Sequence, residues 1–465
     1  MHRSDSAADY DGLYMNTRET MKNSQGALDL QVLGACCGSG LNQLDFALVR
    51  YRQASPDAAL RLKLIQSGSV ATSPPIRNHI LTSLHEVGRN YSPVTRLNTL
   101  LGYLFSKGIM SFCEKHDIPL ASIDLVGTHM SGLRRPGMPE TNDLNTHPLG
   151  WNAIVSAETG LNTVFDLAVN EAGFVTPHVS PVLYVDSLFL RHPSKFRACL
   201  NIGELANYSF IPPMSVESAR GTCCRDCGPG SLLIDYAIKY CTSNDRNEDN
   251  NGRFAAPGKP HEGVVIQFLK TYDYSRMLPS LSVAREMFGD HEAQRLIDEC
   301  VFLKLSEADI IATVTRITAE NILRQYRRLL ALCFPAGQNV DELFIGGPSA
   351  RNANIIDFLE AELPERVITK PLDDIGIPGD ANEAVCYAHL ALEAVLGQPV
   401  RCSAELSWPW SQPGHDTVLG RVVRGGNWET LTARLQKFAG GKPRCLARTV
   451  RIVGSLESGI KDLGL

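Results

Sequence analysis

The last third of the sequence alternates short apolar runs with amphipathic segments, a pattern typical of strands and helices packed in layers. It predicts a strand at 343–345, a helix at 355–362, a strand at 367–369 and a helix at 382–396. Near the start, the apolar runs 32–34 and 46–49 bracket a glycine-rich connection, which indicates a β-hairpin. Together these patterns predict two α/β lobes around a cleft.

The length of the chain also favours two lobes, because 465 residues exceed the size at which one hydrophobic core usually suffices. Residues 1–28 are polar and lack periodicity, so we expect a disordered leader. We place the N-terminal lobe at 29–195, the C-terminal lobe at 196–420 and a C-terminal extension at 421–465. The basic residues of the C-terminal extension are typical of a solvated surface.

Composition and charge exclude several classes of partner. Hydrophobic residues make up 44% and charged residues 20%, which is ordinary for a globular protein. The formal net charge of -5 provides no long-range attraction to nucleic acid or to an anionic membrane. No apolar run approaches the roughly 20 residues that span a bilayer, and the N-terminus lacks the apolar segment of a signal peptide. We therefore expect a cytoplasmic protein that binds small molecules.

The 13 cysteines follow no framework spacing, which favours reduced thiols. Segment 223–227 contains a CxxC pattern that is compatible with half of a zinc site or with a redox pair. A closed zinc site needs four ligands, and no second CxxC lies nearby, although Cys241 is available. The pattern favours thiols packed beside a turn.

Local patterns predict further elements. Ser306 and Asp309 have the spacing of a helix-capping pair, so a helix is expected to begin there and to end near Leu332. Apolar residues at helical spacing indicate another helix at 92–116. We also expect a strand at 123–127, several short strands between 160 and 210, among them 198–202, and a solvated loop at 242–252.

Two glycine-containing turns carry the first functional signal. Segment 226–230 (DCGPG) stands halfway along the chain, and Gly346-Gly347 ends an apolar run. An Asp beside small residues lets backbone N–H groups approach a phosphate while the carboxylate holds a metal ion. A Gly-Gly turn after a strand leaves room for a flat ligand. Together the two turns predict a nucleotide cleft.

Several segments resemble, in the same order, the motifs of the anhydro-N-acetylmuramic acid kinase family. Segment 34–45 (GACCGSGLNQLD) is similar to GxMSGTSxDGxD, segment 201–207 (NIGELAN) to NIGGIAN, and segment 226–230 to DTGPG. Further along, 282–288 (SVAREMF) is similar to STGREYF, 312–319 (ATVTRITA) to ATLxxLTA, and 376–384 (GIPGDANEA) to GIxGDxxEA. The resemblance covers about residues 31–420.

The resemblance implies the two-lobed α/β fold of the actin-like, hexokinase-like and Hsp70-like ATPases, with ATP in a central cleft. Segments 38–45 and 226–230 match the two phosphate loops of the family. The residues expected to bind ATP are Gly38, Ser39, Gly40, Asn42, Asp45, Asp226, Gly228, Gly230, Gly346, Gly347 and Asn352, and Asp45 and Asp226 are also expected to hold Mg²⁺. Asn42 replaces an Asp of the motif, which removes a charge and weakens the binding of a metal or water there.

The family carries its catalytic base in the motif DFRxxDxAxGGQGAPL, which corresponds here to segment 166–178. By register, Glu171 stands at the position of the base, Ala168 replaces an Arg, and the GGQG run is absent. Glu is one methylene longer than the Asp of the motif. We therefore expect Glu171 to act as the base if its backbone lies farther from the substrate by about that length, since a displacement of the carboxylate near 1 Å costs ~100-fold in rate. A surface loop with an ordinary carboxylate is the alternative.

The sugar side of the family site corresponds to residues on several segments. The residues expected to contact the sugar are His129, Asp166, Asn201 and Gly203. His129 keeps the His of an HGQT motif whose Gln and Thr are absent, and a hydrogen-bonded structural role is its alternative.

Two functions fit these observations. The first is an ATP-dependent kinase of an amino sugar or a related anhydro sugar. The second is a catalytically impaired pseudokinase that binds nucleotide and signals through closure of the lobes. Asn42 and Ala168 favour the second, whereas Asp45, Asp226 and Asp380 favour the first, which we adopt. The resemblance also implies a possible homodimer.

Overall fold

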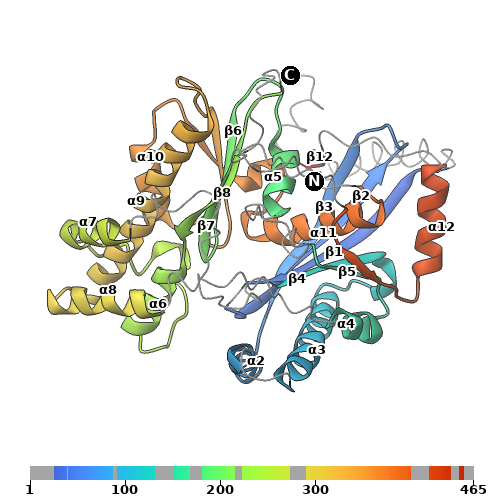
Figure 1. Ribbon diagram of the computed structural model, residues 1–465, viewed down its shortest axis with the longest axis horizontal. Coiled ribbons are helices and arrows are strands. Elements are labelled where there is room, and N and C mark those ends of the chain that lie inside the picture. The colour runs from blue at the N-terminus through green and yellow to red at the C-terminus, as the bar shows by residue number, and fades with distance from the viewer. Residues whose placement is uncertain are drawn as a thin grey trace, which may run out of the picture.

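The protein is described from a computed structural model in which two mixed sheets, each covered by helices, form two lobes (Figure 1). The structure describes residues 26–38, 40–86, 92–130, 151–167, 181–214, 223–272, 290–398, 418–440 and 450–454. Of residues 84–86, 92–95, 181–184, 223–226 and 290 it describes the backbone alone.

The larger sheet has seven strands in the order β11-β5-β4-β1-β2-β3-β12. These strands are β1 (Leu28–Cys37), β2 (Gln43–Gln53), β3 (Leu60–Ala71), β4 (Leu125–Met130), β5 (Thr163–Phe165), β11 (Arg421–Val423) and β12 (Val450–Ile452). Strands β1, β2 and β3 are antiparallel neighbours, whereas β4 runs parallel to β1 and β5 parallel to β4. The pairing of β1 with β2 confirms the predicted hairpin.

The smaller sheet has five strands in the order β10-β9-β6-β7-β8. Its strands are β6 (Arg197–Ile202), β7 (Leu205–Ile211), β8 (Cys223–Pro229), β9 (Glu342–Gly346) and β10 (Ile368–Pro371). Strands β6, β7 and β8 are antiparallel neighbours, β9 runs parallel to β6, and β10 parallel to β9.

The two sheets therefore repeat one plan. In each, a three-stranded antiparallel meander is followed by two strands parallel to its first strand, which gives the orders β3-β2-β1-β4-β5 and β8-β7-β6-β9-β10. One copy of this plan per lobe is the architecture of the actin-like, hexokinase-like and Hsp70-like ATPases. The predicted fold class is confirmed.

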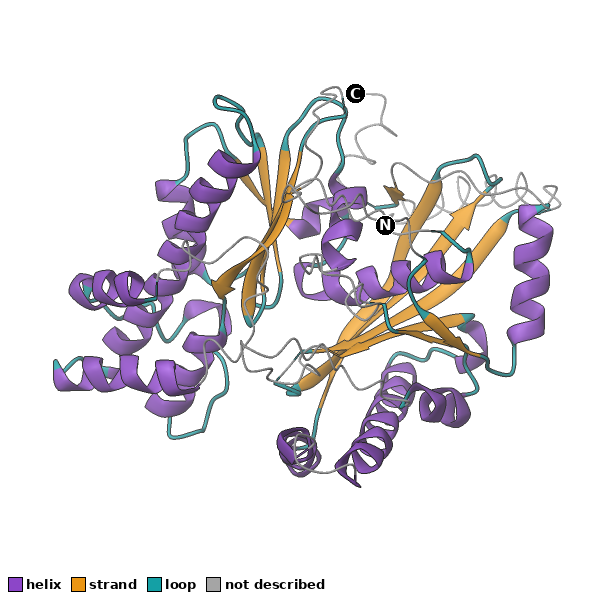
Figure 2. Cartoon of the chain, in the orientation of Figure 1, coloured by secondary structure: helices purple, strands orange, loops and turns teal. Residues whose placement is uncertain are grey.

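Helices and sheets form successive layers (Figure 2). The helices are α2 (Pro74–Glu86), α3 (Ser92–Lys115), α4 (Asn152–Thr159), α5 (Pro181–Leu190), α6 (Leu232–Cys241), α7 (Glu262–Thr271), α8 (Asp290–Phe302), α9 (Glu307–Cys333), α10 (Ala353–Glu362), α11 (Asn382–Val395) and α12 (Trp428–Ala439). Short 3₁₀ turns are η1 (Leu120–Ser122), η3 (Asn250–Gly252), η6 (Leu372–Ile375) and η7 (Gly379–Ala381). Helices α3 and α4 share a core with one face of the larger sheet, α6 to α10 share another with the smaller sheet, and α5 and α11 lie between the sheets. None of the described helices is both long and apolar enough to cross a membrane.

Helix α9 shows how local sequence sets an element. The Ser306 hydroxyl accepts a hydrogen bond from the Asp309 N–H at 3.2 Å and donates one to the Asp309 carboxylate at 2.7 Å. This N-cap satisfies a backbone donor that the first helical turn leaves unpaired. Apolar residues at helical spacing, among them Ile310, Val314 and Ile317, are buried against the smaller sheet. The predicted capped helix is confirmed.

Helix α11 lies directly on the larger sheet, although it comes late in the chain. A Cβ atom on Gly34 of β1 would stand 1.8 Å from the Ala384 carbonyl oxygen, and one on Gly127 of β4 would stand 2.3 Å from the Tyr387 carbonyl oxygen. Only glycine permits so close an approach of helix and strand backbones. Residues from the range 196–420 therefore help to build the larger lobe.

Residues 421–465, expected to form an extension, supply strands at both edges of the larger sheet. Strand β11 pairs antiparallel with β5, and β12 pairs parallel with β3. Between them, Arg434 of α12 contacts the Asp124 carboxylate, with 2.5 Å from Nη1 to Oδ1. The larger lobe is thus assembled from both halves of the chain.

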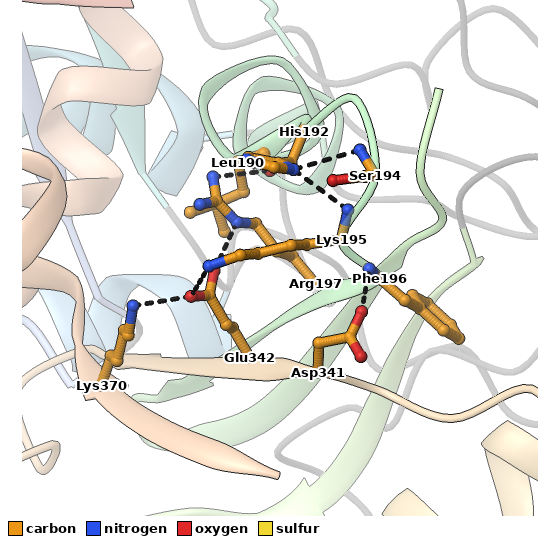
Figure 3. A network of polar contacts seen from close by, with 9 residues as sticks. All are labelled: Leu190, His192, Ser194, Lys195, Phe196, Arg197, Asp341, Glu342 and Lys370. Atoms are coloured by element: carbon orange, nitrogen blue, oxygen red, sulfur yellow. Dashed lines mark hydrogen bonds and ion pairs between the residues drawn. The ribbon is translucent and has the colours of Figure 1, made fainter. Parts of the chain in front are cut away.

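An ion network around the buried Glu342 carboxylate joins three strands of the smaller sheet (Figure 3). The Glu342 side chain is 1% exposed, and it is contacted by Lys195 Nζ at 2.6 Å, Arg197 Nε at 2.8 Å and Lys370 Nζ at 2.7 Å. Burial alone would raise the pKa of Glu342, but hydrogen bonds from Lys195 and Lys370 and the charge of Arg197 outweigh it and lower the pKa to about 2. The carboxylate therefore remains ionised inside the protein.

Candidate functional site

The predicted site residues gather where the parallel strands of both sheets end. Gly38 follows β1, His129 lies near the end of β4, and Asp166 follows β5. In the smaller sheet, Asn201 of β6 is the register partner of Gly346 on β9. The carboxyl ends of parallel strands meet at one edge of a sheet, which is where α/β proteins bind ligands.

The first glycine loop connects β1 to β2 and is tightly turned. The Leu41 N–H donates to the Gly38 carbonyl at 3.1 Å, and Leu41 adopts a φ of 53° with its side chain buried. Arg77 of α2 donates from Nε to the Gly40 carbonyl at 2.6 Å. Asn42 is exposed, and its carbonyl accepts from the Thr72 N–H at 2.9 Å. The loop is therefore held from its own lobe.

The same loop also makes a contact to the other lobe. The Gly40 N–H donates to the Glu204 carboxylate, with 3.1 Å from the nitrogen to Oε1. Glu204 lies in the turn between β6 and β7 of the smaller sheet. The two lobes are therefore in direct polar contact at the first glycine loop.

The second glycine segment is the end of β8 and the turn into α6. Gly228 has a φ of 110°, and a Cβ atom on Gly230 would lie 2.1 Å from the Gly203 carbonyl oxygen. The Gly230 N–H donates to the Glu204 carbonyl at 2.8 Å, and the Ser231 N–H donates to the Gly203 carbonyl at 2.8 Å. The segments 201–207 and 226–230 therefore form one structural unit.

The Gly346-Gly347 turn packs against the end of β6. Gly347 has a φ of 94°, and a Cβ atom there would lie 2.5 Å from Asn201 Oδ1. The Gly347 N–H donates to the Gly379 carbonyl at 2.8 Å. Asn201 and the Ile202 backbone thus fill the place that a side chain at Gly347 would take. The role of this turn in binding a flat ligand stays a prediction.

Asn352 is buried at the start of α10. Its Oδ1 accepts a hydrogen bond from Asn354 Nδ2 at 3.4 Å and would lie 2.5 Å from a Cβ atom on Gly252. These contacts connect the start of α10 to η3. The role of Asn352 in binding ATP stays a prediction.

Partly buried carboxylates lie in both lobes near the contact between them. Burial raises the pKa of Asp45 to about 6, a hydrogen bond from Gln43 opposes this, and the charge of Asp380 adds to it. On α6, burial raises the pKa of Asp235 to about 7, a hydrogen bond from Ser231 opposes this, and Glu204 adds to it. A divalent cation would stabilise their ionised forms, since it prefers carboxylate oxygens. In the described part of the chain, no three His, Cys, Asp or Glu side chains are arranged to hold a metal.

On the sugar side, two of the residues expected to contact the sugar, His129 and Asp166, have protein partners. The His129 ring stacks on Tyr387 with centroids 4.2 Å apart and planes 16° apart. Asp166 has a φ of 55° and pairs with Arg421, with 3.2 Å from Nε to Oδ2. Left-handed backbone is uncommon outside glycine, and Asp is among the residues that adopt it most readily.

Several predicted residues lie outside the described part of the chain. They are Ser39, Ala168, Glu171 and the side chain of Asp226. Their roles stay predictions.

Sequence reasoning missed Glu204 and Arg77, which both contact Gly40. For Glu204 a signal existed, because the motif that segment 201–207 resembles has glycine at that position. For Arg77 no local pattern indicates that its side chain reaches a loop 37 residues away.

Two lobes with one strand plan, joined at glycine turns and flanked by desolvated carboxylates, define a protein of the actin-like, hexokinase-like and Hsp70-like ATPase class. Within this class, the chain belongs to the anhydro-N-acetylmuramic acid kinase family, whose model matches residues 30–405. The family predicted from the motifs is confirmed, and with it the assignment to kinases.

Individual relatives agree with this assignment. The anhydro-N-acetylmuramic acid kinase of Caldanaerobacter subterraneus subsp. tengcongensis is 28% identical over 371 residues, which cover 79% of this chain and 91% of the relative. That of Crocosphaera subtropica is 28% identical over 366 residues, covering 77% and 91%. Among solved structures, component A of the (R)-2-hydroxyglutaryl-CoA dehydratase of Acidaminococcus fermentans aligns with a TM-score of 0.38 and 12% identity, covering 78% of this chain and 98% of that chain. The fold assignment rests on the strand order and not on this alignment.

Proposed function

We propose that the protein is an ATP-dependent phosphotransferase that acts on an amino sugar or a related anhydro sugar with the help of a divalent cation. The observation that carries the proposal is the meeting of the first glycine loop, the β6–β7 turn and the β8–α6 turn through Gly40, Glu204 and Gly230. These segments resemble the phosphate loops and the neighbouring motif of the kinase family, and they lie within the residues 30–405 that the family model matches.

The glycines of these turns suit a nucleoside triphosphate. At Gly230 and Gly347 the protein's own backbone and Asn201 fill the place of a side chain, so glycine brings these turns close to the end of β6 and to the β6–β7 turn. Backbone N–H groups of small residues bind phosphate oxygens at close range. We assign the phosphates to the first glycine loop and the β8–α6 turn, and the adenosine to the Gly346-Gly347 turn.

Asp45 and Asp226 are the residues that we propose hold Mg²⁺. Asp45 is desolvated and faces the charge of Asp380, so it fits a cation that would stabilise its ionised form. When bound with ATP, the cation neutralises charge that develops on the phosphates during transfer. A cytoplasmic location and a homodimer belong to the same proposal.

The proposed chemistry needs one proton acceptor. In the reaction implied by the family, a water oxygen bonds to the acetal carbon of the anhydro sugar as the bond from that carbon to the bridging oxygen breaks. The freed oxygen takes the γ-phosphoryl group of ATP, and ADP leaves. We assign Glu171 as the base that takes the proton of the water.

The pseudokinase is the second candidate. It is favoured by Asn42, which is exposed and uncharged at a position where the motif of the family has an Asp. Such a protein would bind Mg-ATP without transferring its phosphate.

Steady-state release of ADP tests the proposal. The full chain, with ATP and Mg²⁺, is assayed against a panel of amino sugars and anhydro sugars, with Glu171→Gln as the test variant. Glu365→Gln, an exposed residue beyond α10, is the matched control.

We expect release that depends on a sugar in the wild type and in the control, and its loss in Glu171→Gln with nucleotide affinity within a few-fold. On anhydro-N-acetylmuramic acid itself we expect weak activity, because the GGQG run is absent. Nucleotide binding without release on any sugar would instead identify a pseudokinase.

A further inference from the structure

Glu204 contacts both glycine segments at once. Its carboxylate accepts the hydrogen bond from the Gly40 N–H of the larger lobe at 3.1 Å. Its carbonyl accepts from the Gly230 N–H at 2.8 Å and from the Leu232 N–H at 3.3 Å in its own lobe. The backbone of Glu204 is therefore fixed by the second glycine segment, and this places its side chain against the first.

The carboxylate occupies a position suited to an anion. Besides the bond to Gly40, Oε1 would lie 3.9 Å from a Cβ atom on Gly38, so it lies beside two glycines of the loop. Backbone N–H groups in glycine-rich turns bind anionic oxygens, and a carboxylate oxygen bonds them much as a phosphate oxygen does. The Glu204 carboxylate thus binds the Gly40 N–H of the first glycine loop, as a phosphate oxygen would.

The charge of Glu204 also reaches other groups at this edge. After burial, the charges of Asp45 and Glu204 are the largest causes that raise the pKa of the Cys37 thiol at the end of β1. Glu204 likewise contributes to the raised pKa of Asp235. The carboxylate therefore adds negative potential on both sides of the contact between the lobes.

We propose that Glu204 is an internal competitor of phosphate: its carboxylate holds the first glycine loop, and a nucleotide phosphate must displace it to bind. The identity of the displacing ligand rests on the proposed function. Glycine at this position, as in the motif NIGGIAN, has no side chain with which to compete. Glu204 accordingly lowers the affinity for nucleotide and keeps the two lobes in contact when none is bound.

Calorimetric titration of the full chain tests this role. The probes are ADP in the presence of EDTA and Mg-ADP. The variants are Glu204→Gln, which removes the charge, and Glu204→Gly, which also removes the acceptor. Glu299→Gln on α8 is the control, since it makes the same change of charge on an exposed helix surface. Thermal unfolding of each variant verifies that it folds.

Both Glu204 variants are expected to bind ADP about tenfold more tightly than the wild type, because a charge-assisted hydrogen bond no longer has to be broken. The gain should be larger for ADP without Mg²⁺, which carries more negative charge. The control should bind like the wild type.

Three results would overturn parts of this account in different ways. An unchanged Kd in both Glu204 variants, with clear binding by the wild type, rejects the competitor role and leaves the proposed function standing. Weaker Mg-ADP binding in Glu204→Gln with unchanged metal-free binding also rejects it, since the carboxylate would then hold the cation. No binding of nucleotide by any variant rejects the proposed function.

A second measurement needs no nucleotide. Hydrogen exchange of the ligand-free protein should be faster in the peptide that contains Gly40 for Glu204→Gly than for the wild type, because the N–H loses its acceptor. Exchange that is equal in the two proteins would show that the contact does not hold the loop.

Discussion

Asp45 at the start of β2 lies close enough to Asp380 in η7 for the second carboxylate to raise the pKa of the first. Burial is the larger cause of the shift, which brings the pKa of Asp45 to about 6. Asp45 is partly buried, and repulsion from the exposed Asp380 adds to the cost of its charge, so a cation beside Asp45 would be favourable. This relationship is the physical basis of the role that we propose for Asp45.

Asp45→Asn is therefore expected to weaken Mg-ATP binding by about tenfold or more, since the lost carboxylate acts through the cation. Binding of ATP without metal should stay the same or become tighter, because a negative charge is removed. Calorimetry with and without Mg²⁺ measures both. Asp57→Asn, the same change at the exposed β2–β3 turn, is the control. Equal losses in the two conditions would mean that Asp45 has a structural role.

The turn at Gly347 should not tolerate a side chain. Gly347→Ala places a Cβ atom 2.5 Å from Asn201 Oδ1 in a backbone with a φ of 94°, so both strain and a clash result. Gly337→Ala has a similar φ of 88° with nothing within 4 Å, so it reports the backbone strain alone. We expect about 1 kcal/mol of destabilisation for Gly337→Ala and at least about 1 kcal/mol more for Gly347→Ala, measured by urea unfolding. Similar losses would show that the clash is relieved by a small shift.

The buried Glu342 network should carry stability that depends on pH. Glu342→Gln leaves Arg197, which is 3% exposed, without its counter-charge, and is expected to cost about 3 kcal/mol at pH 7. The folded pKa of about 2 lies below the ordinary value of 4.5, so this stability is present above pH 4.5 and is lost as the pH falls toward 2.

Urea unfolding at several pH values measures the effect. Glu362→Gln is the matched control, because Glu362 pairs with Arg327 on the surface at 50% and 57% exposure and should cost less than about 1 kcal/mol. A loss at pH 7 no larger than that of the control would contradict the network's role.

Asp186 on α5 should give a pH dependence of the opposite sign. The residue is 2% exposed, Oδ1 accepts from Asn382 Nδ2 at 2.9 Å, and Oδ2 has no hydrogen-bond partner among the described residues. Burial raises its pKa from 3.8 to about 6, against the opposing hydrogen bonds from Asn382 and Cys386. Because the folded pKa lies above the unfolded one, ionisation costs stability as the pH rises from about 4 through 6.

Asp186→Asn removes this ionisation. From pH 5 to pH 8 the free energy of unfolding of the wild type should fall by about 1 kcal/mol relative to the variant. Asp45 and Asp235 titrate in both proteins, so their effects cancel in the difference. A constant difference between the two proteins across this range would show that Asp186 does not titrate there.

The sequence predicted those parts of the fold that depend on neighbours along the chain. The β1–β2 hairpin and the capped start of α9 at Ser306 follow from apolar periodicity and from one side chain with its nearest N–H groups. Strands β11 and β12 have three residues each, which is too short for a periodic signal in the sequence. They form strands because they pair with β5 and β3. Tertiary pairing forms these edges of the larger sheet.

In the site, the glycine turns were predictable because their motifs carry a backbone requirement. The Glu204–Gly40 contact was not, since it joins residues 164 positions apart and depends on how the lobes meet. Burial of Asp186 is likewise invisible in a sequence, because it results from the packing of α5 on α11. Contacts between the lobes are therefore the part of the account that only the structure supplies.

Hydrogen exchange with and without Mg-ADP tests most directly whether the two lobes share one nucleotide site. The account predicts slower exchange at the same nucleotide concentration in the β1–β2 loop of the larger lobe and in the β6–β7 turn, the β8–α6 turn and the Gly346-Gly347 turn of the smaller lobe. Exchange in the exposed part of α8, around Asp298 and Glu299, should stay unchanged and serves as the internal reference. Protection confined to one lobe, or no protection at a saturating concentration of nucleotide, would contradict the account.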